Sequence, residues 1–162
     1  STRVIGPASP SCGCGRRGCL EALASRMAIA VAAAGAAQRG AAPWLLKNAG
    51  TDVAAIRSNI LADSIKNGDR AVEDIIRQAA RWIGVAVSNA VNLLGPDIVV
   101  LGGGLVEAMP TLFKNEVAEV AAARVMPPFV GTFKVAAAKL GDRATAQGAA
   151  AWARQQISGQ SR

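Results

Sequence analysis

The sequence predicts a single α/β domain in which helices dominate and cover a small sheet. Of the 162 residues, 51% are hydrophobic but only 4% are aromatic. Much of the apolar content is alanine, which favours closely packed helices over an aromatic-rich β-sandwich. Most apolar residues also recur at helical spacing, and only short runs in the second half have the continuous apolar character of buried strands. The length suits one domain rather than two.

Helices account for most of the first ninety residues. The apolar residues Leu20, Leu23, Met27 and Val31 predict a helix over residues 20–38. Residues 40–50 contain glycine and proline and are typical of a connection. A second helix is expected to begin at a Thr51 cap and to end near residues 67–68. The longest helix is predicted over residues 70–94, where one continuous apolar face is stopped by a Gly-Pro pair.

The period changes after residue 96. Residues 98–101 (Ile-Val-Val-Leu) form a short apolar run that is typical of a strand buried on both faces. Gly102, Gly103 and Gly104 follow and open a helix expected over residues 106–124. A loop at residues 127–128, a second strand over 133–137 and an alanine-rich helix over 144–156 complete the expected pattern.

Composition and charge exclude several classes of protein. Hydrophobic residues make up 51% of the chain and charged residues only 18%, a composition that excludes a disordered protein. No apolar stretch reaches the roughly 18 residues of a membrane span, so we expect a soluble, cytoplasmic protein. The net charge is +7, but the sequence has no run of five like charges and no basic stretch interleaved with aromatic residues. This pattern indicates a mildly basic surface for anionic ligands rather than a nucleic-acid face.

All three cysteines lie within eight residues, as Cys12, Cys14 and Cys19, with glycines between them. Cys12 and Cys14 are too close for an easy disulfide, and a third thiol would remain. Three thiolates in a glycine loop can instead converge on a soft tetrahedral cation such as zinc. We expect Arg16 and Arg17 to favour the thiolate form. Reduced cysteines without a metal, or a redox pair, are the alternative interpretations.

A closed zinc site needs a fourth ligand, and the chain contains no histidine and no further cysteine. The fourth ligand could precede Ser1 in a longer parent, or water or a carboxylate could fill the position, or no metal binds. The first residues lack a starting methionine and a signal peptide, which suggests a chain cut from something longer.

Two further features are candidates for ligand contact. Glu21 lies in the first turn of the helix after the cysteine loop, where it could face a ligand or be an ordinary first-turn acid. Gly102, Gly103 and Gly104 join a strand to a helix, where backbone N–H groups can surround an anion. Tight strand-to-helix turns also contain glycine for steric reasons alone.

The segment from Cys12 to Glu21 resembles the cysteine signature of the ROK proteins, which are bacterial sugar kinases and sugar-responsive repressors. Residues 92–104 resemble the part of these proteins that forms the adenosine side of the nucleotide site. Residues 140–150 resemble the start of their C-terminal helix. The resemblance covers nearly the whole chain.

The resemblance implies an actin-like ATPase (ribonuclease H-like) fold, of which residues 1–162 form the C-terminal lobe. In that lobe residues 12–19 are the zinc loop and residues 97–122 are the strand–turn–helix unit on the nucleotide side. The N-terminal ATPase lobe of the family, with its phosphate loop, catalytic aspartate and zinc-binding histidine, finds no match here. That histidine would fall at or just before Ser1 and Thr2.

Residue by residue, the resemblance implies zinc ligation by Cys12, Cys14 and Cys19 and a sugar hydroxyl contact by Glu21. It also implies nucleotide contact near Gly102, Gly103 and Gly104, and no catalytic residue in this chain. The zinc would be structural, and ATP and Mg²⁺ would serve the parent enzyme. A hexose and ATP are the expected partners, no membrane is involved, and a homodimer is compatible with the composition.

We therefore expect the C-terminal part of an ATP-dependent, glucokinase-like hexose kinase that phosphorylates the 6-hydroxyl of a sugar and is inactive alone. The alternative is the ligand-sensing lobe of a ROK transcriptional repressor. Only in that case would we expect the parent protein to bind nucleic acid. A degenerate lobe kept only for dimerisation is a third reading.

Overall fold

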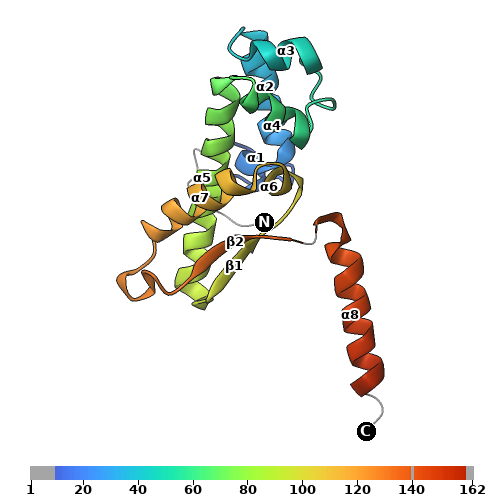
Figure 1. Ribbon diagram of the computed structural model, residues 1–162. Coiled ribbons are helices and arrows are strands. Elements are labelled where there is room, and N and C mark those ends of the chain that lie inside the picture. Colours follow the sequence, from blue (N-terminus) through green and yellow to red (C-terminus); the bar gives the residue numbers. More distant parts are fainter. Residues whose placement is uncertain (1–9, 140, 160–162) are drawn as a thin grey trace.

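A long helix, α5 (Arg70–Leu94), runs through the centre of the molecule and carries most of its packing (Figure 1). The computed structural model describes residues 10–139 and 141–159. The helices before α5 are α1 (Glu21–Ala24), α2 (Arg26–Gln38), α3 (Pro43–Ala49) and α4 (Ser58–Lys66). The elements after it are β1 (Ile98–Leu101), α6 (Gly104–Ala108), α7 (Pro110–Ala122), the 3₁₀ turn η1 (Pro127–Phe129), β2 (Lys134–Ala137), the 3₁₀ turn η2 (Gly141–Arg143) and α8 (Ala144–Gly159).

The core forms where α5 meets α7 and α2. Gly84 allows α5 and α7 to approach closely, because a Cβ atom there would lie 2.7 Å from the Cβ of Val120. Glu116 on α7 forms ion pairs with Arg77 and Arg81 across this crossing. Hydrogen bonds from Arg77 to Glu73 and Glu116 raise the pKa of the Arg77 guanidinium. The predicted bounds of α5 are confirmed, and Gly95 ends it in the left-handed conformation with φ 57°.

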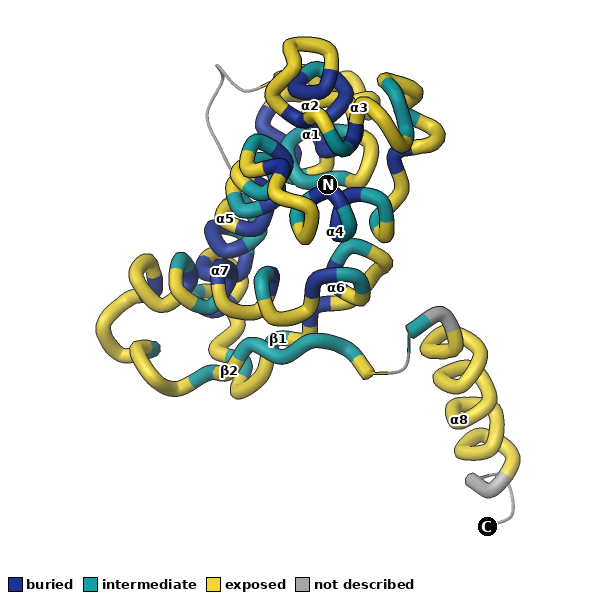
Figure 2. Tube along the Cα trace, turned by 45° about the horizontal axis from the view of Figure 1, so that its top comes forward, coloured by how far each residue is buried: buried dark blue, intermediate teal, exposed yellow. Residues whose placement is uncertain are grey.

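The sheet consists of β1 and β2, which pair in parallel from Ile98 opposite Lys134 to Leu101 opposite Ala137. Both strands were predicted, β2 within a residue. The expectation that β1 is buried on both faces is wrong for the described residues. Leu101 is buried, but Ile98 and Val100 point to the other face and are 56% and 58% exposed. In Figure 2 the buried, dark blue residues lie mainly on helices, whereas the two strands are mostly teal or yellow.

Asp69 explains a helix that the sequence pattern missed. The structure places α3 within the expected connection of residues 40–50. The Asp69 carboxylate accepts hydrogen bonds from the backbone N–H groups of Trp44 and Leu45, at 3.2 and 2.8 Å, and from the Ser64 hydroxyl at 2.7 Å. The first turn of α3 is therefore capped by a residue 24 positions later in the chain than Leu45. No local pattern contains that information.

Three predicted helices are shorter or broken. Ser25 interrupts the helix expected over residues 20–38, because its extended backbone and its hydroxyl cap α2 at the Ala28 N–H. The helix expected from Thr51 begins at Ser58, and Asp52 instead accepts the Ala54 N–H in a local turn. Pro110 starts a new helix, so that the one expected over residues 106–124 is divided into α6 and α7.

The last helix, α8, stands apart from the rest of the molecule (Figure 1). It packs mainly against the short turn η2, and every residue of α8 whose burial is described is exposed. Its predicted position over residues 144–156 is confirmed. Across the part of the chain that the structure describes, no helix combines the length and apolarity that crossing a bilayer requires.

Candidate functional site

The cysteine loop brings its three sulfur atoms together, as the spacing predicted. A backbone hydrogen bond from Cys12 N to Arg16 O (2.7 Å) and an antiparallel bridge between Ser11 and Arg17 close the loop. Gly15 and Gly18 have φ 81° and 77°, conformations that other residues rarely adopt, so glycine is required at these turns. The Sγ atoms of Cys12, Cys14 and Cys19 all lie within 4.8 Å of one another, and those of Cys14 and Cys19 are 3.6 Å apart.

These separations fit a metal site. Thiolates bound tetrahedrally at the usual Zn–S distance of about 2.3 Å have sulfur atoms about 3.8 Å apart. Cys19 is fully buried and Cys14 is exposed, so one side of the cluster is anchored in the protein while the other is open to solvent. The three cysteines could therefore bind a metal ion. Within the described residues no fourth side chain joins them.

The surroundings of Cys12 oppose the shift toward thiolate that we expected. A hydrogen bond from the backbone N–H of Cys14 lowers the pKa of the Cys12 thiol, but contact with the Cys14 and Cys19 thiols and partial burial outweigh it. The pKa of Cys12 is therefore raised. Arg16 and Arg17 are both exposed, and they do not reverse this effect. The neutral thiol is the preferred form until a cation replaces the proton.

Glu21 is the first residue of α1, directly after the cysteine loop. Its side chain is exposed and lines a cavity of about 210 Å³ together with Leu20, Ala24, Ser25 and Ile83. Glu21 therefore faces a cavity, as a ligand contact requires. Because α1 is a single turn of four residues, its helix dipole adds little to the interaction of Glu21 with a ligand.

The glycines Gly102, Gly103 and Gly104 form the turn between β1 and α6. Gly103 has φ 104°, a conformation that excludes most side chains. The three glycines line a cavity of about 280 Å³, whose other walls include Ala24, Arg26, Ser58 and Ile83. This turn therefore exposes bare backbone to a cavity, which a ligand needs in order to approach closely.

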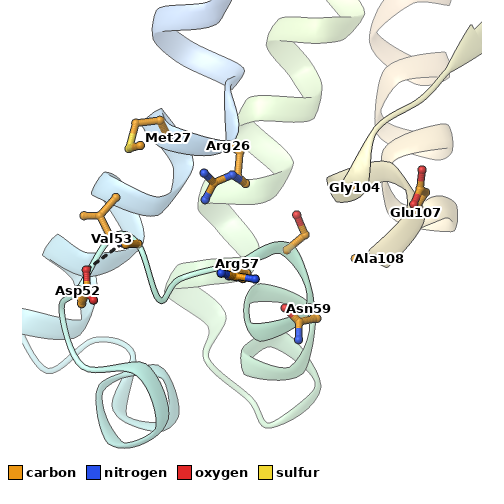
Figure 3. Close-up of a pocket in the computed structure, with 11 residues that line it drawn as sticks. Arg26, Met27, Asp52, Val53, Arg57, Asn59, Gly104, Glu107 and Ala108 are labelled. Atoms are coloured by element: carbon orange, nitrogen blue, oxygen red, sulfur yellow. Dashed lines mark hydrogen bonds between the residues drawn. The ribbon is translucent and has the colours of Figure 1, made fainter. Parts of the chain in front are cut away.

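A larger cleft of about 1050 Å³ opens beside the glycine turn (Figure 3). Its walls come from the start of α2, the loop before α4, the first turn of α4, and α6. The charged side chains that line it are Arg26, Asp52, Arg57 and Glu107. A cleft of this size is large enough for a nucleotide or a similar small molecule.

The three cavities share lining residues and so lie in a row. The Glu21 cavity and the glycine-turn cavity share Ala24 and Ile83. The glycine-turn cavity and the large cleft share Arg26, Ser58 and Gly104. Two sites that the sequence indicated separately are therefore adjacent in the fold, although no single cavity holds both.

Sequence reasoning missed the two arginines of the large cleft. Arg26 becomes the first residue of α2 only because Ser25 breaks the helix, and Arg57 is the N-cap of α4, which starts later than expected. Because serine is a favoured N-cap residue, Ser25 could have predicted a helix that begins at Arg26. Nothing in the sequence pattern joins Arg57 to it, since 31 positions separate them along the chain.

Comparison with known proteins gives consistent matches. The ROK family model matches residues 3–156. A glucokinase from Thermotoga maritima is 33% identical over 156 residues, which are 96% of this chain and 49% of the relative. An N-acetylmannosamine kinase from Escherichia coli O1:K1 is 30% identical over 144 residues, 88% of this chain and 44% of the relative. The chain thus spans about half the length of the relatives it matches.

Solved structures agree with this result. A ROK family glucokinase from Streptomyces griseus, in complex with glucose and AMPPNP, superposes with a TM-score of 0.80 at 29% identity. The match covers 95% of this chain and 50% of that one. A ROK family transcriptional regulator homologous to the Escherichia coli MLC protein superposes with a TM-score of 0.60. At 21% identity, with 83% of this chain and 32% of that one covered, this second likeness shows the fold alone. The predicted actin-like ATPase fold is confirmed, and the chain belongs to the ROK family.

Proposed function

We propose that this chain is the C-terminal lobe of an ATP-dependent hexose kinase, glucokinase-like, that phosphorylates the 6-hydroxyl of its sugar. The row of cavities from Glu21 to the glycine turn is the observation that carries the proposal. A kinase must hold a sugar and a nucleotide side by side, and this row offers a carboxylate at one end and bare backbone and arginines at the other. Relatives named as glucokinase and N-acetylmannosamine kinase support the same reaction class.

In this proposal Glu21 accepts a hydrogen bond from a sugar hydroxyl. A carboxylate is a strong acceptor, and hydroxyl-rich ligands are commonly oriented by such charged hydrogen bonds. Gly102, Gly103 and Gly104 contact the nucleotide through their backbone, with Mg²⁺ and the phosphoryl chemistry supplied in the full enzyme.

Cys12, Cys14 and Cys19 hold a structural zinc ion in the same proposal. The donor set and the sulfur separations fit zinc, which prefers thiolates in a tetrahedral arrangement. When bound, the metal would fix the loop that leads directly into α1, so that Glu21 is presented from a rigid support. The loop residues 12–19 thus stabilise the site without contacting the reacting atoms.

The sensing lobe of a repressor is the second candidate, because a ROK transcriptional regulator has the same fold and the fold alone does not distinguish the two roles. A sensing lobe needs the sugar but not the nucleotide. Binding of ADP to this chain would therefore favour the kinase, and binding of sugar alone would favour the sensor. If the chain binds neither sugar nor nucleotide, the result would support the third hypothesis, a lobe kept only for dimerisation.

The Glu21 proposal is tested by calorimetric titration of the chain with glucose. Replacing Glu21 by Gln should weaken glucose binding about tenfold, because the hydrogen bond from the sugar hydroxyl then goes to a neutral acceptor instead of a charged one. The matched control is Glu119→Gln on α7, an exposed glutamate outside all three cavities, which should leave the affinity unchanged. Equal glucose affinity for the two variants would reject the role of Glu21.

The chain alone should show no turnover with glucose, ATP and Mg²⁺. None of its residues matches the family's catalytic base or phosphate loop, so the chain can bind but cannot transfer the phosphoryl group. A coupled assay for ADP release measures this, and sugar-dependent turnover above background would contradict the assignment of catalysis to the other lobe.

A further inference from the structure

The large cleft contains two arginines without an acidic partner. Arg26 at the start of α2 and Arg57 before α4 line it on the same side, opposite Gly104 and Glu107 (Figure 3). Neither forms an ion pair within the described part of the chain, although Arg77 and Arg81 do. Two like charges in one cleft repel each other, and a bound anion would relieve that repulsion.

The two carboxylates of the cleft do not pair with its arginines. Asp52 accepts the backbone N–H of Ala54 at 2.9 Å, at the end of the cleft farther from Gly104. Glu107 lies on the opposite wall beside η2, where its Oε2 is 3.7 Å from the position that a Cβ of Gly141 would take. Neither carboxylate comes within 4.0 Å of an arginine nitrogen in the described residues. The two arginines therefore lie together in the middle of the cleft, and the two carboxylates lie toward its opposite ends.

We propose that Arg26 and Arg57 together bind a phosphate group of the nucleotide that occupies this cleft. The proposal rests on the proposed kinase function and adds to it two phosphate-binding residues outside the glycine turn. Guanidinium groups bind phosphate oxygens through paired N–H donors, with greater strength than neutral donors. Across the cleft, Glu107 is an acceptor of the kind that ribose hydroxyls or an amino group require.

The first turn of α4 supports the same assignment. Ser58 and Asn59 line the cleft, and the N-cap of this nine-residue helix is Arg57, whose side chain has no acceptor atom. The backbone N–H groups at this end are therefore not capped by a side chain and can contribute to anion binding. The charge of the arginines, rather than the helix end, remains the main determinant.

The experiment compares titrations of the intact chain with ADP, adenosine and glucose 6-phosphate. ADP should bind at least about tenfold more tightly than adenosine, and Arg26→Gln and Arg57→Gln should each remove most of that advantage. Both variants should bind adenosine as the parent chain does. Arg57→Lys should recover part of the loss, because it restores the charge without the paired donors. Circular dichroism checks that each variant keeps its helical content.

Arg70→Gln is the matched control, since Arg70 is exposed at the start of α5 and lies outside the cleft. It should leave ADP affinity unchanged. If ADP and adenosine bind equally, or if Arg70→Gln weakens ADP binding as much as the cleft variants do, the arginine pair is not a phosphate site. If glucose 6-phosphate alone depends on the arginines, the anion is the sugar product and the nucleotide assignment is wrong. Absence of binding by both ADP and adenosine would instead reject the nucleotide part of the proposed function together with this inference.

Discussion

At the scale of single residues, the cysteine loop is where sequence and structure agree best. The spacing of Cys12, Cys14 and Cys19 and the glycines between them predicted convergent sulfur atoms, and the structure brings these atoms within 4.8 Å. The prediction succeeded because loop closure here is local: all three residues lie in one short hairpin, held by hydrogen bonds within the loop. The identity of the metal is a proposal that metal analysis can test directly.

Purified chain should contain zinc, weakly held, because three thiolates bind it less tightly than a complete set of four ligands. Replacing the exposed Cys14 by Ser should abolish zinc retention during dialysis. Arg17→Gln, an exposed change in the same loop, should not alter it. Metal content measured by mass spectrometry before and after dialysis against a chelator provides the readout. Zinc that resists the chelator at one ion per chain would indicate that another group completes the site.

At the scale of secondary-structure elements, Asp69 holds α3 and α4 together. It is 2% exposed, and it joins the end of α4 to the start of α3 through three hydrogen bonds. Because the Leu45 N–H and the Ser64 hydroxyl that it binds are also buried, removing the carboxylate leaves buried donors without acceptors.

Asp69→Ala should therefore lower the free energy of unfolding by about 3 kcal/mol, the sum of a lost cap and unsatisfied buried donors. Asp63→Ala is the matched control, because Asp63 forms only an exposed ion pair with Lys66, and it should cost less than about 1 kcal/mol. Urea denaturation of both variants measures the difference. Similar costs for the two would mean that α3 is held by its apolar contacts rather than by Asp69.

The same scale shows which elements the sequence could predict. Helix α5 was predictable to the residue because 25 residues carry one apolar face and end at a Gly-Pro stop. Helix α3 was missed because Asp69, which caps it, lies far along the chain. The start of α4 was predicted too early because residues after Thr51 form a local turn at Asp52 instead of a helix. Arg26 and Arg57 were missed for the related reason that only the tertiary structure brings them into one cleft.

At the scale of the whole molecule, several large apolar side chains near the junction of α5 and β1 are exposed. Leu93 and Leu94 at the end of α5 are 81% and 74% exposed, and Ile98 and Val100 of β1 are 56% and 58% exposed. Parallel sheets are normally covered on both faces, so the exposed face of β1 supports the proposal that the chain is one lobe of a larger kinase. The match with a glucokinase of about twice the length supports the same reading.

Helix α8 gives this proposal a test within the chain itself. The structural match leaves only a twentieth of the chain uncovered, and α8 has 16 residues, about a tenth. Part of α8 therefore lies inside the region shared with the Streptomyces griseus glucokinase. Its described side chains are exposed here, and Trp152 among them is 65% exposed. A glycine-containing helix of this length without tertiary packing is marginally stable in water. The body of the protein should then fold without α8.

A variant ending at Arg143 should accordingly have the same urea midpoint as the complete chain. Amide hydrogens of α8 should exchange orders of magnitude faster than those of α5, because only α5 is held by the core. Val91→Ala is the matched comparison, since Val91 is fully buried on α5 and its truncation should cost about 2 kcal/mol. If removing α8 lowers the free energy of unfolding as much as Val91→Ala does, α8 packs against the rest of this chain in solution. The proposal that α8 packs against another lobe would then be wrong. Unchanged stability together with rapid exchange would leave α8 as a helix whose packing partner lies outside this chain.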